Sequence, residues 1–267
     1  GSTEWLGSNK PVKNLLDNSD FTNPVNQRGQ TSYVSGQKEY GIDRWFLWST
    51  DGTSTQTIND GSITVAPHTA SNIVMAQRFE KGYLDSSKHY TRAVRYVDGT
   101  IGIGVAVIQN QQSTNYDVID VIAESSEKTI LWAALYEGSY TADTLPPYTT
   151  KGYVAELAEC QRYYQRINAS YPIMASGYTI STNAARIAVQ LQNIMRIAPT
   201  VTVDATKVGI IYNGQYLYAE SANWSTEVAK KKPIISADMT LSGAPFQGLG
   251  YPIVTYLEAD INVSADL

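Results

Sequence analysis

Aromatic residues gather around a predicted turn near residue 214 and are the first candidates for ligand recognition. Asn213-Gly214 separates two strand-like runs, Val208–Tyr212 and Gln215–Ala219. An Asn-Gly pair between two such runs is typical of a tight hairpin. Four aromatic residues flank this turn: Tyr212, Tyr216, Tyr218 and Trp224. We expect their rings to contact a ligand or to pack against a neighbouring sheet or subunit. Tyr216 and Tyr218 are expected on one face of the strand.

Two further aromatic residues are candidates for ligand contact. Phe246 lies in the glycine-rich loop Ser242–Tyr251, which otherwise reads as an ordinary turn region. Trp48 follows Asp43-Arg44-Trp45, and an exposed indole there offers a face for stacking a sugar ring. Trp45 is predicted to be a core residue with Asp43 and Arg44 paired nearby. The loop Asn26–Gly29 is predicted to make structural hydrogen bonds rather than ligand contacts.

Acidic residues close in sequence do not form a catalytic pair. Asp117 and Asp120 are three positions apart in a predicted strand and therefore face opposite sides. Glu258 and Asp260 share a face, but it is the polar, solvent-directed face of a strongly patterned segment. Carboxylates distant in sequence could still meet in space, as glycoside hydrolysis requires. No enzymatic activity is predicted.

Other reactive side chains are few. His68 and His89 each lack a second metal ligand nearby, and the single cysteine, Cys160, is predicted to be a packing residue. The glycines of Gly99–Gly104 lie in a strand-like run with no helix after them, so they do not form a phosphate-binding loop. We therefore predict neither a metal site nor a cofactor.

The composition is that of a recognition protein. Charged residues make up 17% of the 267 residues, and the net charge is −5. Nucleic-acid binding and membrane insertion are therefore not expected, because Lys230–Lys232 is the single basic cluster and no apolar run is long enough to span a bilayer. Nineteen tyrosines are present against 4 phenylalanines. Tyrosine-rich, charge-poor surfaces are typical of binding proteins.

Strand signals dominate the chain. The run Ile101–Val107 alternates aliphatic residues with glycine or alanine after the turn signal Asp98-Gly99, and Ile187–Gln192 and Tyr256–Leu267 also alternate with period two. Many short strands with turn residues between them are typical of sandwiches and barrels. Further strands are expected at Ser62–Val65, Asn72–Phe79, Tyr116–Ala123, Thr129–Tyr136 and Ile234–Leu241.

One helix interrupts the strands and divides the chain. Residues 151–167 hold good helix formers, Thr150 could cap them, and Tyr153, Leu157, Cys160, Tyr164 and Ile167 recur at helical spacing. Pro146-Pro147 ends the preceding segment. We expect a tag remnant and lead-in at 1–11, a β-sandwich at 12–148, a linker and helix at 149–167 and a smaller distal β domain at 168–267.

Four blocks carry a resemblance to a known family. They are Asn14–Gly29 (NLLDNSDFTNPVNQRG) with Tyr40–Trp45 (YGIDRW), Glu156–Arg166 (ELAECQRYYQR), Met195–Val203 (MRIAPTVTV) and Leu257–Leu267 (LEADINVSADL). Together they resemble the C-terminal receptor-binding region of bacteriophage and prophage tail fibres. That resemblance implies a jelly-roll sandwich similar to a carbohydrate-binding module, then the helix, then a distal β tip. It fixes no binding residues.

The resemblance implies a function in host attachment. Such fibres are usually homotrimers at the distal end of the virion, joined through an upstream shaft to the baseplate, and their tips bind capsule or lipopolysaccharide. The alternatives are a polysaccharide-degrading tailspike domain and a carbohydrate-binding module of a secreted bacterial enzyme. The helix face formed by Tyr153, Leu157, Cys160, Tyr164 and Ile167 is predicted either to meet its copies at a three-fold axis or to pack on the sheet of its own domain.

Overall fold

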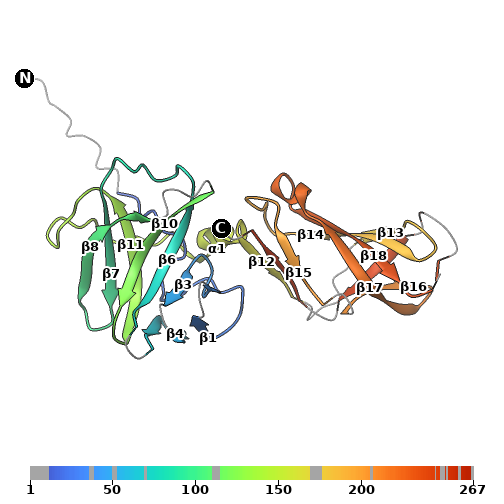
Figure 1. The fold of residues 1–267 in the computed structure, drawn as a ribbon, viewed down its shortest axis with the longest axis horizontal. Coiled ribbons are helices and arrows are strands. Elements are labelled where there is room, and N and C mark those ends of the chain that lie inside the picture. Colours follow the sequence, from blue (N-terminus) through green and yellow to red (C-terminus); the bar gives the residue numbers. More distant parts are fainter. Residues whose placement is uncertain are drawn as a thin grey trace, which may run out of the picture. The chain divides into compact units, whose positions relative to one another are not determined.

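The computed structural model describes residues 12–35, 39–49, 53–68, 71–109, 115–168, 176–204, 207–243, 245–246, 250, 252–257 and 260–265. Within them the chain is antiparallel β structure with one α-helix, which confirms the predicted all-β class (Figure 1). The expected tag remnant at residues 1–11 lies outside the described residues. The chain divides into two compact units, the first ending at Glu156 and the second beginning at Leu157.

The first unit contains two antiparallel sheets. The six-stranded sheet has the order β1-β4-β5-β11-β7-β8 and the five-stranded sheet the order β2-β3-β6-β10-β9. The first comprises β1 (Ser32–Ser35), β4 (Ser54–Asn59), β5 (Ser62–Ala66), β11 (Lys128–Glu137), β7 (Tyr90–Tyr96) and β8 (Ile101–Ala106). The second comprises β2 (Glu39–Tyr40), β3 (Phe46–Ser49), β6 (Ile73–Glu80), β10 (Tyr116–Glu124) and β9 (Ile108–Gln109).

One hydrophobic core joins these two sheets. Alternate residues of β6 and β10 in one sheet and of β5, β7 and β11 in the other belong to the same buried cluster. Met75, Ile119 and Leu135 are fully buried there. Because successive strand residues point to opposite faces, this alternation leaves a second set of side chains on the outer face of each sheet.

The segment Asn14–Asn18 is tied to the core by side-chain hydrogen bonds. The Asn14 amide donates to the carbonyl of Ala133, and its oxygen accepts from the amide of Leu135. Asn18 has a φ of 51°, a left-handed conformation that asparagine tolerates. Its side chain satisfies both the N–H and the C=O of Val25. These asparagines therefore have structural roles.

The second unit contains a closed barrel and a small sheet. The barrel has the order β13-β14-β18-β17-β16-β19, and the three-stranded sheet has the order β12-β20-β15. The barrel strands are β13 (Ser176–Thr179), β14 (Ala184–Gln190), β18 (Ile234–Leu241), β17 (Gln215–Ser225), β16 (Val208–Tyr212) and β19 (Pro252–Leu257). The small sheet comprises β12 (Tyr164–Ile167), β20 (Ile261–Ser264) and β15 (Thr200–Thr202); a 3₁₀ helix, η2, spans Glu227–Lys230.

The predicted hairpins and most predicted strands are confirmed. Gly99, with a φ of 92°, lies in the turn between β7 and β8. Asn213 and Gly214 have φ values of 48° and 75° in the two-residue turn between β16 and β17, as a type I′ hairpin turn requires. The predicted strand Ile234–Leu241 coincides with β18.

The predicted helix over 151–167 is too long. Helix α1 spans Tyr153–Gln161, and Tyr164–Ile167 forms β12 instead, paired with Ile261–Ser264. Pairing with a strand far along the sequence outweighs the local helix propensity of this segment. The residues predicted to share one helix face therefore do not share one. Tyr153 is 44% exposed, Cys160 is fully buried, and Tyr164 lies in a strand.

The alternation at the C-terminus does not form one strand. Residues up to Leu257 belong to β19 of the barrel, whereas Ile261–Ser264 belong to β20 of the small sheet. Glu258 lies outside the described residues. Both segments keep a period of two because each alternates its residues between the two faces of its own sheet. A pattern that continues across two strands therefore hides the boundary between them.

Candidate functional site

A row of polar side chains crosses four strands on the outer wall of the barrel. Tyr178 of β13 is the cross-strand neighbour of Arg186 in β14. Arg186 lies beside Asp238 of β18, and Asp238 lies beside Asn223 of β17. Their neighbours along β14, β17 and β18 alternate into the apolar core of the barrel. The strands therefore present these four side chains together on the outer wall.

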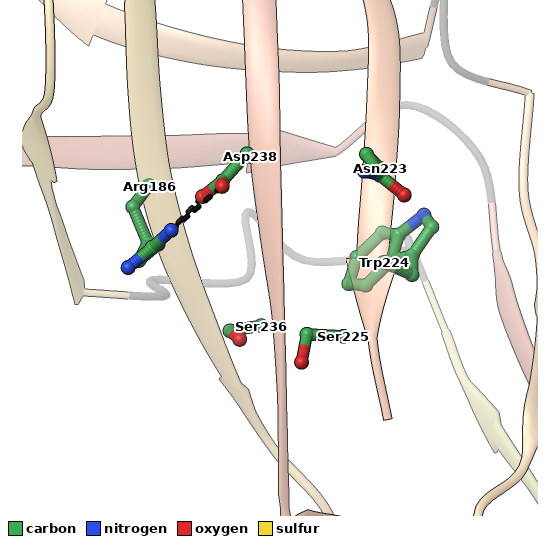
Figure 2. Close-up of a pocket in the computed structure, with 6 residues that line it drawn as sticks. All are labelled: Arg186, Asn223, Trp224, Ser225, Ser236 and Asp238. Atoms are coloured by element: carbon green, nitrogen blue, oxygen red, sulfur yellow. Dashed lines mark hydrogen bonds and ion pairs between the residues drawn. The ribbon is translucent and has the colours of Figure 1, made fainter. Parts of the chain in front are cut away.

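Arg186 and Asp238 form a two-point ion pair in the middle of this row. The guanidinium donates from Nε to Oδ1 at 2.5 Å and from its terminal nitrogen to Oδ2 at 2.7 Å (Figure 2). Both side chains remain accessible, at 47% and 40%. The hydrogen bonds to Asp238 raise the pKa of Arg186, which also bonds to Tyr178, and those from Arg186 lower the pKa of Asp238. Asp238 is therefore an ionised acceptor at neutral pH.

A shallow pocket lies beside this ion pair. It has a volume of about 190 Å³, and Figure 2 shows the side chains that line it, with Ser225 and Ser236 below the ion pair. Those two serines are direct cross-strand neighbours. The pocket thus combines hydroxyl, amide, guanidinium and carboxylate groups, which can donate and accept several hydrogen bonds. The lining residues are Arg186, Asn223, Trp224, Ser225, Ser236 and Asp238.

A β-bulge in β17 decides where the predicted aromatic residues point. The pairing of β17 with β18 shifts between Ala219 and Ser221, which leaves Glu220 as an extra residue. The extra residue exchanges inward and outward positions in the rest of the strand. Trp224 consequently packs, partly buried, against the barrel core while also lining the pocket.

Tyr216 and Tyr218 lie before the bulge and point outward. They are 59% and 40% exposed, as expected for two residues on one strand face. Gly209 is the cross-strand neighbour of Tyr218, and a Cβ at Gly209 would be 3.2 Å from the Tyr218 ring. The absence of a side chain there lets the ring lie against the barrel wall. The structure thus separates these tyrosines from Trp224, which lies on the other face of the strand.

The other predicted aromatic contacts have packing roles. Tyr212 and Phe246 form an edge-to-face pair with centroids 5.0 Å apart. Phe246 is 3% exposed, and both residues belong to the barrel core. In the first unit, Trp48 packs, partly buried, with Phe46 and Val74 on the outer face of the five-stranded sheet. None of these three residues lines the barrel-wall pocket.

Trp45 and the Asn26–Gly29 loop are structural, as predicted. Trp45 is fully buried and donates its indole N–H to the carbonyl of Asn18 at 2.7 Å. Asp43 accepts hydrogen bonds from the amide of Gln27 and from Arg28, each at 2.7 Å. The loop is therefore held by a buried carboxylate that pairs with Arg28, and Arg44 pairs with Asp17.

Two of the acidic residues considered as catalytic candidates form ion pairs. Asp117 is 4% exposed and pairs with Lys81 at 2.7 Å. Asp260 bonds to Arg166 at 2.6 Å. Among the described residues, no group of three histidine, cysteine or acidic side chains could hold a metal ion. In the same part of the chain, no helix has the length and apolar composition of a membrane span.

Comparison of the chain with protein-family models, with curated proteins and with solved structures finds no match.

Most of the pocket could not be predicted from the sequence. Of the six lining residues, Trp224 was a predicted ligand contact, whereas Arg186 and Asp238 were not. A signal was present, because each is a single charged residue at an outward position of an otherwise apolar or small-residue strand, AARIAVQ and IISADMTL. What the sequence does not show is that these two strands are neighbours.

Proposed function

We propose that this protein is a non-catalytic receptor-binding protein, the distal part of a phage tail fibre, and that its barrel unit attaches to a surface polysaccharide of the host bacterium. The observation that carries the proposal is the polar row on the barrel wall. An ionised carboxylate, a guanidinium, an amide and two hydroxyls surround a shallow pocket of about 190 Å³. Sugars present many hydroxyls, each of which can donate and accept, so these groups match them.

The chemistry of the row supports binding rather than hydrolysis. A general acid for glycoside cleavage needs a raised pKa, whereas Arg186 lowers the pKa of Asp238. A shallow polar pocket binds weakly by itself. The resemblance to tail fibres implies a homotrimer, and three copies of a weak site on one fibre raise the overall affinity through effective concentration. We therefore retain the homotrimer as part of the proposal.

Binding to immobilised polysaccharides tests this proposal. The probes are purified bacterial capsular polysaccharides and lipopolysaccharides, and the variants are Arg186→Ala and a matched control, Lys88→Ala. Lys88 also forms an exposed ion pair, with Glu137 at 2.7 Å, but in the first unit. We expect the wild type and Lys88→Ala to bind equally, and Arg186→Ala to bind about tenfold more weakly or worse, a loss of about 1.4 kcal/mol.

The same samples separate the alternatives. Equal binding by Arg186→Ala and the wild type would exclude the barrel-wall pocket as the site. Shortening of a polysaccharide during incubation, measured by size-exclusion chromatography, would favour the degrading tailspike instead. Light scattering measures the oligomer, and a particle with the mass of a single chain would exclude the homotrimer.

A further inference from the structure

A second polar groove lies at one side of the first unit, where both sheets end. Strand β8 is the last strand of the six-stranded sheet, and β9 is the last strand of the five-stranded sheet. In the described residues β9 pairs only with Val118 and Ile119 of β10, so the rest of β10 borders this side. A cavity of about 200 Å³ opens here, lined by residues of β7, β8 and β10.

Two glycines shape the wall that β8 contributes. Gly102 and Gly104 are cross-strand neighbours of Val94 and Arg92, on the inner face of their sheet. A Cβ at Gly102 would be 3.2 Å from the Tyr96 hydroxyl, and one at Gly104 would be 3.1 Å from Nε of Arg92. Because these positions lack side chains, the phenol and the guanidinium lie close against β8. Both groups line the groove.

Hydrogen bonds hold both planar groups in place. The Tyr96 hydroxyl donates to the Glu124 carboxylate at 2.5 Å, and Arg92 donates to the carbonyl of Val121 at 2.8 Å. Burial, followed by the hydrogen bond to Glu124, raises the pKa of Tyr96, so the phenol stays protonated. Lys128 lies 5.7 Å from the centroid of the Tyr96 ring. The ring therefore has a fixed orientation before any ligand arrives.

Charges of both signs surround this groove. Arg92 and Lys128 supply positive charge, and Glu124 and Asp120 supply negative charge. A phosphate would be repelled by the two carboxylates, and a strongly charged cation would be repelled by Arg92 and Lys128. A neutral sugar fits better, because its hydroxyls can bond to the guanidinium and the carboxylate while its apolar carbons contact the Tyr96 ring.

We propose that this groove is a second saccharide site, which binds one neutral pyranose unit of a glycan. It is built entirely from the first unit and does not depend on the barrel-wall pocket. A protein with both sites would hold a polysaccharide at two places on each chain. Failure of one site therefore leaves the other site testable.

Ligand-observed NMR on the full chain tests the groove directly. The probes are the neutral monosaccharides glucose, galactose, mannose, N-acetylglucosamine and rhamnose, measured by saturation transfer. The variants are Tyr96→Ala and the control Arg95→Ala, which removes the neighbouring side chain on the opposite face of β7. We expect at least one sugar to bind to the wild type and to Arg95→Ala, and Tyr96→Ala to bind it about tenfold more weakly.

Two further variants keep the result decisive. If Tyr96→Ala loses its cooperative thermal unfolding, Glu124→Leu replaces it, because that change keeps a side chain of similar size and removes the oxygen that accepts from the phenol. Arg186→Ala should leave the sugar signal unchanged. A wild type that binds none of the sugars would overturn the groove proposal. Binding by the folded groove variant equal to that of the wild type would also overturn it. A saturation-transfer signal that disappears only in Arg186→Ala would overturn it as well.

Discussion

The two units each contain an arginine–aspartate pair with similar nitrogen–oxygen distances, and the two pairs lie in opposite environments. A terminal guanidinium nitrogen of Arg28 lies 2.7 Å from Oδ1 of Asp43, and the side-chain exposures of the two residues are 16% and 1%. Arg186 and Asp238 form bonds of 2.5 and 2.7 Å, with exposures of 47% and 40%. Burial rather than pairing therefore distinguishes them. The first pair is committed to the fold, whereas the second is open to a ligand.

The surroundings of the two pairs point the same way. The carboxylate of Asp43 also accepts the amide of Gln27, so it organises a loop beside the buried Trp45. The barrel-wall pair instead borders a pocket whose other polar groups face solvent. Removing one partner of a buried pair destabilises a structure, whereas an exposed pair contributes little to stability and leaves its hydrogen-bonding groups accessible to a ligand.

The largest effect is expected at the buried pair. Asp43→Ala removes the acceptor of Gln27 and leaves Arg28 without its carboxylate. Breaking a buried pair costs about 3–5 kcal/mol, because the remaining charge is no longer compensated. We expect a loss of unfolding free energy at the lower end of that range, because Arg28 keeps some contact with water. Urea denaturation followed by tryptophan fluorescence measures it, and a loss below about 1 kcal/mol would contradict the structural role of Asp43.

An intermediate effect is expected at Asp17, in acid. Burial of Asp17 opposes ionisation, but Arg44 at 3.2 Å and Lys151 at 2.7 Å outweigh it and lower its pKa. A carboxyl with a lowered pKa stabilises the folded state above the unfolded pKa, near pH 3.9. That stabilisation is lost as the pH falls through the folded pKa. The stability of the wild type should therefore fall more steeply below about pH 4 than that of Asp17→Asn.

Denaturant midpoints across that pH range measure the difference between the two proteins. Asp143→Asn is the control, because Asp143 is exposed and the substitution removes one carboxyl without disturbing the pairs with Arg44 and Lys151. Parallel pH profiles for the wild type and Asp17→Asn would show that the two cations do not stabilise the charged form.

The local part of the fold could be predicted from the sequence, and the long-range part could not. The Asn213-Gly214 hairpin and the strand Ile234–Leu241 follow from turn chemistry and period-two alternation, and the structure confirms both. Helix α1 was predicted too long, because Tyr164–Ile167 pairs with residues about a hundred positions away. Local propensity contains no information about such a partner.

The candidate site shows the same division. Trp224 was predicted as a ligand contact, and it lines the pocket from a position that the bulge at Glu220 moved to the inner face. Arg186 and Asp238 lie 52 residues apart and meet because β14 and β18 are neighbours in the barrel. Neither a bulge nor the order of strands is visible in a single sequence. Chemistry was therefore predictable residue by residue, and its assembly into a pocket was not.

The smallest effect on stability is expected at the exposed pair. Asp238→Asn keeps the size of the side chain and one acceptor oxygen and removes the charge that Arg186 binds. Exposed ion pairs contribute about 0–1 kcal/mol, because water solvates both partners after the pair breaks. The unfolding free energy should therefore change by less than about 1 kcal/mol, in contrast to Asp43→Ala. Binding to the polysaccharide retained by the wild type should nevertheless weaken, because the variant loses an ionised acceptor in the pocket. A large loss of stability with unchanged binding would reverse the comparison and make the barrel-wall pair the structural one.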